Sequence, residues 1–263
     1  MKNEISISSC FDYDIPLEEQ MKYIAQAGFT HISLGSELKH SKIFEEGQTE
    51  KIKNALNKYG LRIDTIHFSQ ALSTSNWYPV MENTMRTAKE LNCSVVVVHC
   101  TSFMGNEIQD DEDVLKLKQA VCELTELCKK YNIRAALENL SPGKPTDILI
   151  QLLSASDLNY IGFCYDSSHD QIDGPRPMEL LKQMKHRLIA LHVSDRIKPF
   201  TDHVTIGEGF INFKEMTEIL QTEDLDFPFL MEVMKTHSRF KETKEFLYKA
   251  YTGAYGIASN IKK

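Results

Sequence analysis

The chain has 263 residues, of which 42% are hydrophobic and 25% are charged. These values are close to the average of globular proteins, and they exclude a collagen-like, disordered or coiled-coil chain. Thirty Lys and Arg side chains stand against 37 Asp and Glu side chains, so the net charge is -7. No global basic field is available to recruit nucleic acid or an anionic membrane, and we expect neither as a partner.

The cysteines and the N-terminal segment indicate the cellular compartment. The six cysteines form no C-x-x-C pair, and residues 1–9 lack the apolar stretch of a secretory signal. The longest unbroken apolar stretches, such as residues 95–98, are far too short to span a membrane. We therefore expect reduced thiols and a cytoplasmic location.

Short runs rich in β-branched residues alternate along the chain with longer segments whose apolar residues recur at helical spacing. The predicted strands are residues 5–9, 31–34, 62–68, 94–100, 134–138, 160–165, 188–193 and 229–233. The predicted helices are residues 17–27, 50–59, 80–91, 113–131, 146–153, 177–185, 213–220 and 243–251. The alternation predicts eight βα units.

These units average about 33 residues, close to the roughly 30 residues of one βα step in a (β/α)8 barrel. No interval is left for a second domain, so we expect one TIM barrel domain over residues 1–263. Gly28 and Gly60 lie just past two predicted helices, where a left-handed residue closes the last turn. An open doubly wound sheet has the same alternation, but no G-x-G-x-x-G follows the first strand, and the barrel is preferred.

Residue types that bind metals recur at the same point in six consecutive units. The third to eighth predicted strands end in His67, His99, Glu138, Asp166, His192 and Glu232. Two more imidazoles, His169 and His203, lie in the adjoining loops. The C-terminal ends of the strands and the loops after them form the active face of a βα barrel. The pattern therefore predicts that these side chains meet at one mouth.

Each of these residues also has a purely structural interpretation. A single imidazole such as His67 is commonly a packing residue, Asp166 could cap a helix, and His192 could be a buried neutral ring. Glu138 and Glu232 follow apolar runs, where a carboxylate is costly to desolvate unless it is paired, protonated or bound to metal. The structural interpretations do not explain the shared position in successive units, so one common site is favoured.

The stretches that carry these residues are ALENLSPGKPT, GFCYDSSH, LIALHVSD, DHVTIGEGFINF and FLMEV. At these residues the chain resembles the xylose isomerase-like TIM barrel superfamily, which contains sugar isomerases and epimerases together with the endonuclease IV DNA-repair enzymes. The resemblance spans residues 136–233, and His67 and His99 extend it back to the third strand. The series Glu, Asp-x-x-His, His and Glu at strand ends is fairly specific for the superfamily and does not determine the substrate.

In the epimerase branch the resemblance implies one divalent cation, usually manganese, magnesium or cobalt, held by Glu138, Asp166, His192 and Glu232. The cation would polarise a ketose carbonyl and stabilise an enediolate. The resemblance further implies that Glu138 and Glu232 are the acid/base pair and that His169 holds a substrate hydroxyl. The implied activity is that of a sugar or sugar phosphate isomerase or epimerase.

The endonuclease IV branch uses three zinc ions, and its pattern would also recruit His67, His99, His169 and His203. That branch places an Asp two residues before the His of an Asp-x-His segment, where this chain has Thr201, with Asp202 adjacent instead. The isomerase or epimerase interpretation is therefore preferred. A metal-dependent lyase or hydrolase of a sugar-like substrate, a DNA-repair nuclease and a metal-binding protein without activity are the alternatives.

The sequence leaves open whether the sugar carries a phosphate. Arg196, Lys198 and Lys235 follow the seventh and eighth strands, where barrel enzymes often bind phosphate, but exposed solubilising charge is the preferred explanation. Gly207 and Gly209 are either turn glycines or positions where the backbone approaches a ligand.

Overall fold

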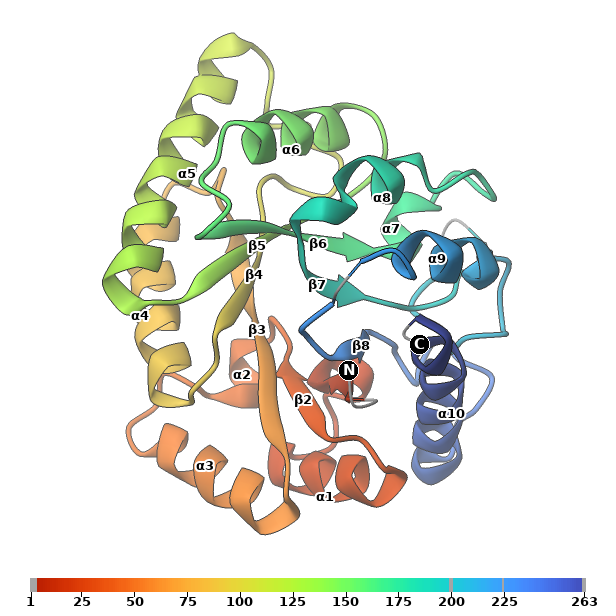
Figure 1. Ribbon diagram of the computed structural model, residues 1–263. Coiled ribbons are helices and arrows are strands. Elements are labelled where there is room, and N and C mark those ends of the chain that lie inside the picture. Colours follow the sequence, from red (N-terminus) through yellow and green to blue (C-terminus); the bar gives the residue numbers. More distant parts are fainter. Residues whose placement is uncertain (1–3, 199–200, 224, 262–263) are drawn as a thin grey trace.

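The computed structural model describes residues 4–198, 201–223 and 225–261. Eight parallel strands form a nearly closed barrel, and helices surround it (Figure 1). The strands are β1 (Ile5–Ser8), β2 (His31–Leu34), β3 (Arg62–Ala71), β4 (Val95–His99), β5 (Arg134–Glu138), β6 (Ile161–Asp166), β7 (Leu188–His192) and β8 (Phe229–Met231). The prediction of a (β/α)8 barrel is confirmed.

The long helices occupy the intervals predicted for them. They are α1 (Leu17–Ala27), α3 (Gln48–Tyr59), α4 (Trp77–Glu90), α5 (Asp111–Tyr131), α6 (Lys144–Ser154), α8 (Glu179–Met184), α9 (Phe213–Leu220) and α10 (Thr243–Ile261). Helix α10 extends well past residue 251, because Ala254 and Ile257 continue its buried face. Among the described residues, no helix combines the length and the hydropathy needed to cross a bilayer.

Four short elements were not predicted. They are the one-turn helices α2 (Leu38–Ser41) and α7 (Ser167–Asp170) and the 3-10 turns η1 (Ser9–Phe11) and η2 (Lys185–Arg187). A single turn is too short to produce a periodic apolar pattern, so sequence periodicity does not detect it. The glycines predicted to end α1 and α3 do so: Gly28 and Gly60 have φ angles of 101° and 69°.

The barrel closes between the last two strands. The strands pair in the order β7-β6-β5-β4-β3-β2-β1-β8. Just past the end of β7, the N–H of Val193 donates to the carbonyl oxygen of Leu230 at 2.9 Å, and the N–H of Glu232 donates to Val193 at 3.0 Å. An open doubly wound sheet is therefore excluded. The closure also holds the C-terminal ends of β7 and β8 side by side.

Strand alternation directs the predicted ligands into the mouth. A small apolar cluster contributed by β4 to β7 lies inside the barrel and consists of Val95, Val97, Ala136, Cys164, Ile189 and Ala190. Side chains two positions apart on a strand share a face. The residues two positions after Val97, Ala136, Cys164 and Ala190 are His99, Glu138, Asp166 and His192. These four side chains therefore stand above the apolar cluster, at the C-terminal end of the barrel.

The barrel interior has little spare room, and Gly162 in β6 tests this. A Cβ at Gly162 would lie 2.6 Å from Cγ1 of Ile189 in β7. We expect Gly162→Ala to lower the free energy of unfolding by about 1–3 kcal/mol, the usual cost of overpacking. Gly256→Ala in α10 is the matched control, because its Cβ would meet nothing within 4 Å. Urea denaturation measures both variants, and equal stability losses would contradict the tight interior.

Candidate functional site

The mouth of the barrel holds a buried cluster centred on Glu138, whose side chain is 0% exposed. Its Oε2 atom lies 3.1 Å from Nε2 of His67 and 3.0 Å from Nε2 of His99. Its Oε1 atom lies 3.0 Å from Nδ1 of His192 and 3.6 Å from Nδ1 of His169. One carboxylate therefore contacts side chains from three other strand ends and the helix after β6.

Asp166, at the end of β6, uses its two carboxylate oxygens differently. Oδ1 accepts the N–H of His169 at 2.7 Å and caps the one-turn helix α7. Oδ2 is buried and has no hydrogen-bond partner. A buried carboxylate oxygen without a donor is costly, and a cation would compensate it. The helix cap uses one oxygen and leaves the other without a hydrogen-bond partner, so the two roles that the sequence offered for Asp166 are compatible.

The opposite side of the mouth is formed by β7, β8 and the loop between them. Nδ1 of His192 lies 2.8 Å from Oε2 of Glu232. Nε2 of His203 lies 3.7 Å from the same Glu232 oxygen and 3.8 Å from Oδ2 of Asp166. Four possible ligand atoms lie within 4.8 Å of one another, one each from Glu138, Asp166, His192 and Glu232. The structure therefore brings the four predicted metal ligands together.

Four further groups of possible ligands overlap this central group, and two of them share only one residue with it. One consists of His67, His99 and Glu138, and the other of Asp166, His169 and His203. Each shares one carboxylate with the central group. All eight candidate residues of the sequence analysis are therefore placed in the mouth, in a layout that offers positions for more than one cation.

The hydrogen bonds of two imidazoles show that the cluster fits a cation. Nδ1 of His67 lies 2.9 Å from the carbonyl oxygen of Phe68, which can only accept, so this nitrogen carries the hydrogen. In the neutral ring Nε2 then directs a lone pair at Glu138, and the two acceptors repel unless a proton or a metal ion lies between them. Nδ1 of His169 likewise faces the carbonyl oxygen of Asn139 at 3.0 Å, which leaves its Nε2 available to a ligand.

The ionisable groups of the mouth shift one another in opposite directions. Burial acts to lower the pKa of His192, but the charges of its neighbours, Glu138 and Glu232 among them, raise it well above its usual value. Burial acts to raise the pKa of Glu138, but His192 holds it well below its usual value. Burial raises the pKa of Asp166. Glu138 and His192 therefore favour each other's charged forms, whereas burial favours the neutral form of Asp166.

The loop after β7 orients His203 through residues that sequence analysis did not assign. Oδ1 of Asp202 lies 3.3 Å from Nδ1 of His203, and Oδ2 accepts a hydrogen bond from Nη2 of the buried Arg196 at 2.9 Å. This arrangement leaves Nε2 of His203 directed at Asp166 and Glu232. His203 has a φ of 53°, an uncommon value outside glycine. Among the described residues Asp202 joins no group of possible ligands, and its contact is with the ring of His203.

Asn139 was also missed by the sequence analysis. Its Oδ1 accepts the N–H of Asp166 at 2.8 Å, and its Nδ2 donates to the carbonyl oxygen of Asp166 at 2.9 Å. The side chain thereby joins the ends of β5 and β6 and holds Asp166 beside Glu138. Its position directly after Glu138 was the available signal.

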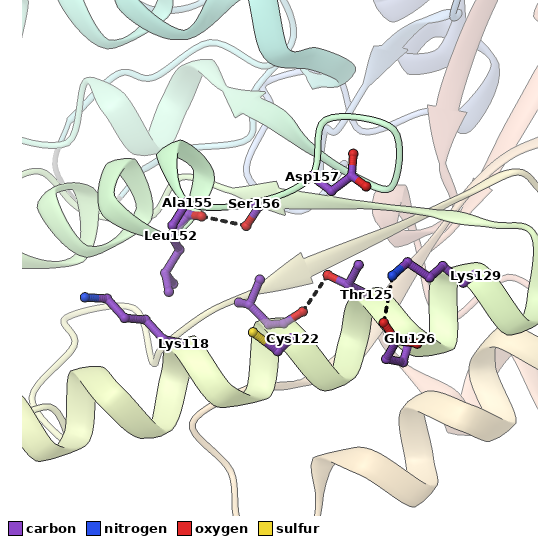
Figure 2. A pocket seen from close by; sticks show the side chains of 10 residues that line it. Lys118, Cys122, Thr125, Glu126, Lys129, Leu152, Ala155, Ser156 and Asp157 are labelled. Atoms are coloured by element: carbon purple, nitrogen blue, oxygen red, sulfur yellow. Dashed lines mark hydrogen bonds and ion pairs between the residues drawn. The ribbon is translucent and has the colours of Figure 1, made fainter.

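A separate groove lies on the outer wall between α5 and α6, with a volume of about 320 Å³ (Figure 2). Its polar side chains bond locally: Thr125 donates to the carbonyl oxygen of Val121 at 2.8 Å, and Lys129 pairs with Glu126 at 2.8 Å. None of the ligand groups found among the described residues includes a residue of this groove. The mouth is therefore the candidate site.

The family described as "Xylose isomerase-like TIM barrel" matches residues 21–250. The chain belongs to this family. A curated relative, the uncharacterized protein y4fM of Sinorhizobium fredii, is 21% identical over 95% of this chain and 90% of its own length.

Two solved structures share the fold of this xylose isomerase-like barrel. A D-tagatose 3-epimerase-like protein has a TM-score of 0.77 and 20% identity, covering 97% of this chain and 98% of that one. The IOLI protein with a binding zinc atom has a TM-score of 0.79 and 16% identity, covering 98% of this chain and 99% of that one. At these identities the likeness shows a common fold, and the chemistry must be argued from the mouth itself.

Metal binding tests the geometry of Asp166. We expect Mn²⁺ to raise the thermal midpoint of the metal-free protein, because a ligand that binds only the folded state stabilises it. Asp166→Asn keeps a good helix cap but removes the charge of the unpartnered oxygen, and it should weaken Mn²⁺ binding more than about tenfold. Titration calorimetry measures the affinity. Asp157→Asn, on the outer groove, should bind as the wild type does, and the same result for Asp166→Asn would refute its role as a ligand.

Proposed function

We propose that the protein is a divalent-metal-dependent isomerase or epimerase of a sugar or sugar phosphate. The observation that carries the proposal is the convergence of Glu138, Asp166, His192 and Glu232 within 4.8 Å at the mouth of the barrel. Membership of the xylose isomerase-like family and the similarity to a D-tagatose 3-epimerase-like protein support it.

Glu138, Asp166, His192 and Glu232 would hold the cation. A mixed set of carboxylates and one imidazole suits manganese, magnesium or cobalt, and it also accepts zinc. When bound, such a cation polarises a ketose carbonyl and stabilises the enediolate that forms when the neighbouring carbon loses a proton. The unpartnered Oδ2 of Asp166 and the acceptor pair of His67 and Glu138 are the features that favour this assignment.

Two carboxylates would move the proton. Glu138 and Glu232 approach the same nitrogen, Nδ1 of His192, at 3.0 and 2.8 Å, one from β5 and the other from β8. We assign them as the acid/base pair that removes a proton from one face of the sugar and returns it to the other. Glu232 is the more accessible of the two, since 12% of its side chain is exposed.

The imidazoles around the mouth would position the substrate. His99 is open to solvent, with 29% of its side chain exposed, whereas His67 lies deeper. We assign His99, His169 and His203 to substrate hydroxyls, because an imidazole both donates and accepts hydrogen bonds. His67 would instead support Glu138 from below.

Glu138→Gln tests the acid/base assignment. The amide keeps the shape of the side chain but cannot take up the proton, so kcat should fall by about 10²–10⁴-fold at saturating Mn²⁺. The thermal midpoint of the metal-loaded protein reports whether the fold is intact. Glu126→Gln, on the outer face of α5, is the matched control and should keep the wild-type kcat. Unchanged turnover in Glu138→Gln on a verified ketose substrate would reject the assignment.

A hydrolytic function is the second candidate, and the overlapping ligand groups are the observation that favours it. Together with the central group, two ligand groups would suit the three zinc ions of an endonuclease IV-like enzyme. One contains His67 and His99, and the other contains His169 and His203. Against this, Asp202 bonds to Arg196 and His203 and is not placed as a ligand. A lyase or hydrolase of a sugar-like substrate would use the central group in a related way.

The number of bound metal ions separates these candidates. We expect elemental analysis to find one exchangeable Mn²⁺ or Mg²⁺ per chain, and we expect DNA with an abasic site to remain uncut. Close to three zinc ions per chain, together with cleavage of that DNA, would favour the nuclease. A screen of ketoses and their phosphates with added Mn²⁺ completes the test. Tight metal binding with no turnover of any of them would support a metal-binding protein without activity.

A further inference from the structure

The loops after β7 and β8 occupy the place where TIM barrels frequently bind the phosphate of a substrate. In this protein the backbone N–H groups of Gly207, Gly209 and Ile211 and the side chains of Arg196 and Lys235 already bond to groups of the protein itself. We propose that the mouth takes an unphosphorylated sugar and has no phosphate subsite. The inference rests on the proposed function and narrows its substrate class.

In the loop after β7, backbone N–H groups converge on one point, and the carboxylate of Asp195 occupies that point. Its Oδ2 accepts the N–H groups of Gly207 at 3.0 Å and Gly209 at 2.8 Å, and its Oδ1 accepts the N–H of Ile211 at 3.0 Å. Successive backbone N–H groups that converge on one point are a common phosphate-binding device in proteins. Here the point is filled by a side chain that is 1% exposed, so a phosphate would find these donors already used.

The turn is closed tightly over Asp195. The N–H of Phe210 donates to the carbonyl oxygen of Arg196 at 3.0 Å, and a Cβ on Gly209 would collide with that oxygen. Gly209 is therefore required for close approach of one part of the chain to another. This resolves the question left open by the sequence, because the two glycines serve a turn and not a ligand.

Two of the three cations that pointed to a phosphate site, Arg196 and Lys235, are bonded within the fold. Arg196 is buried, and it donates from Nε to the carbonyl oxygen of Ser168 at 2.8 Å and from Nη2 to Asp202 at 2.9 Å. The ammonium of Lys235 pairs with the carboxylate of Asp12 in the loop after β1. Turning either cation to a ligand would break an ion pair with a buried or half-buried carboxylate.

A second carboxylate, Glu208, joins the two loops. Its Oε2 accepts the N–H of Thr205 at 3.0 Å and the hydroxyl of Ser238 at 2.5 Å, and its Oε1 accepts the N–H of Arg239 at 2.8 Å. Each of these donors is another candidate for a phosphate contact, and each is used. Glu208 also adds a negative charge that would repel an anion.

Lys198 is the exception among the cations that the structure describes in these two loops. Its side chain is exposed and has no described carboxylate partner, whereas Lys241 donates to the carbonyl oxygen of Thr236 at 2.9 Å. A single exposed ammonium at a loop is the usual form of a solubilising charge. Lys198 is therefore the residue to remove when the absence of a subsite is tested.

The charge of the metal cluster favours the same conclusion. The three carboxylates of Glu138, Asp166 and Glu232 exceed the charge of one divalent cation by one. A phosphate group with a charge of about -1.5 to -2 would be repelled from this mouth. Neutral hydroxyls, in contrast, are well matched by imidazoles that can donate or accept.

Two matched comparisons test the inference on the manganese-loaded protein. The first measures the rise in thermal midpoint caused by sorbitol and by sorbitol 6-phosphate at the same concentration. We expect the phosphate ester to protect no more than sorbitol does, and equal protection, including none by either, supports the inference. The inference would be overturned if sorbitol 6-phosphate raised the thermal midpoint by an amount that corresponds to at least tenfold tighter binding than that of sorbitol.

The second comparison measures turnover of D-fructose and fructose 6-phosphate. We expect the kcat/KM of the free ketose to be at least tenfold higher, and Lys198→Ala to leave this ratio unchanged. A higher kcat/KM for fructose 6-phosphate than for D-fructose would overturn the inference. If Lys198→Ala then abolished this preference, the phosphate subsite would lie at Lys198. If neither ketose reacts, the proposed function is what fails for these sugars, while the binding comparison still decides whether a phosphate subsite exists.

Discussion

Carboxylates that are buried close together repel one another, and the mouth of this barrel collects Glu138, Asp166 and Glu232 in a space where ligand atoms lie within 4.8 Å. The imidazoles around them can relieve the repulsion only by taking up protons, which burial opposes. Oδ2 of Asp166 has no hydrogen-bond partner at all. A bound divalent cation would resolve these conflicts together, and the surrounding hydrogen bonds hold the carboxylates close to one another.

The backbone of the barrel creates this arrangement. Asp166 pairs in register with His192, and Glu138 pairs in register with His99, so their side chains leave neighbouring strands at the same height. The closure through Val193 places the end of β8 next to the end of β7. Parallel strands thus bring residues far apart in sequence to one point, above the small apolar cluster contributed by β4 to β7.

The mouth and the loops beside it contain two kinds of buried carboxylate. Asp195 and Glu208 are satisfied by backbone N–H groups and hydroxyls, so they shape the loops and need nothing from outside. The carboxylates of the mouth face one another and the rings of histidines. The hydrogen-bond partners of a buried carboxylate therefore distinguish a structural residue from a candidate metal ligand more clearly than its residue type does. This difference in partners also underlies our proposal that the mouth binds a cation and neutral hydroxyls.

The sequence by itself determined the eight βα units, the strand ends that carry the ligand types and the family, because periodicity and local motifs are properties of consecutive residues. It did not reveal Asn139, Asp195 or Arg196 as the residues that position the mouth, since their partners lie many residues away along the chain. It also left open whether Asp166 caps a helix and whether Arg196 and Lys235 face a ligand. Only the tertiary structure decided these points, because hydrogen bonds and ion pairs depend on which distant atoms folding brings within about 3 Å.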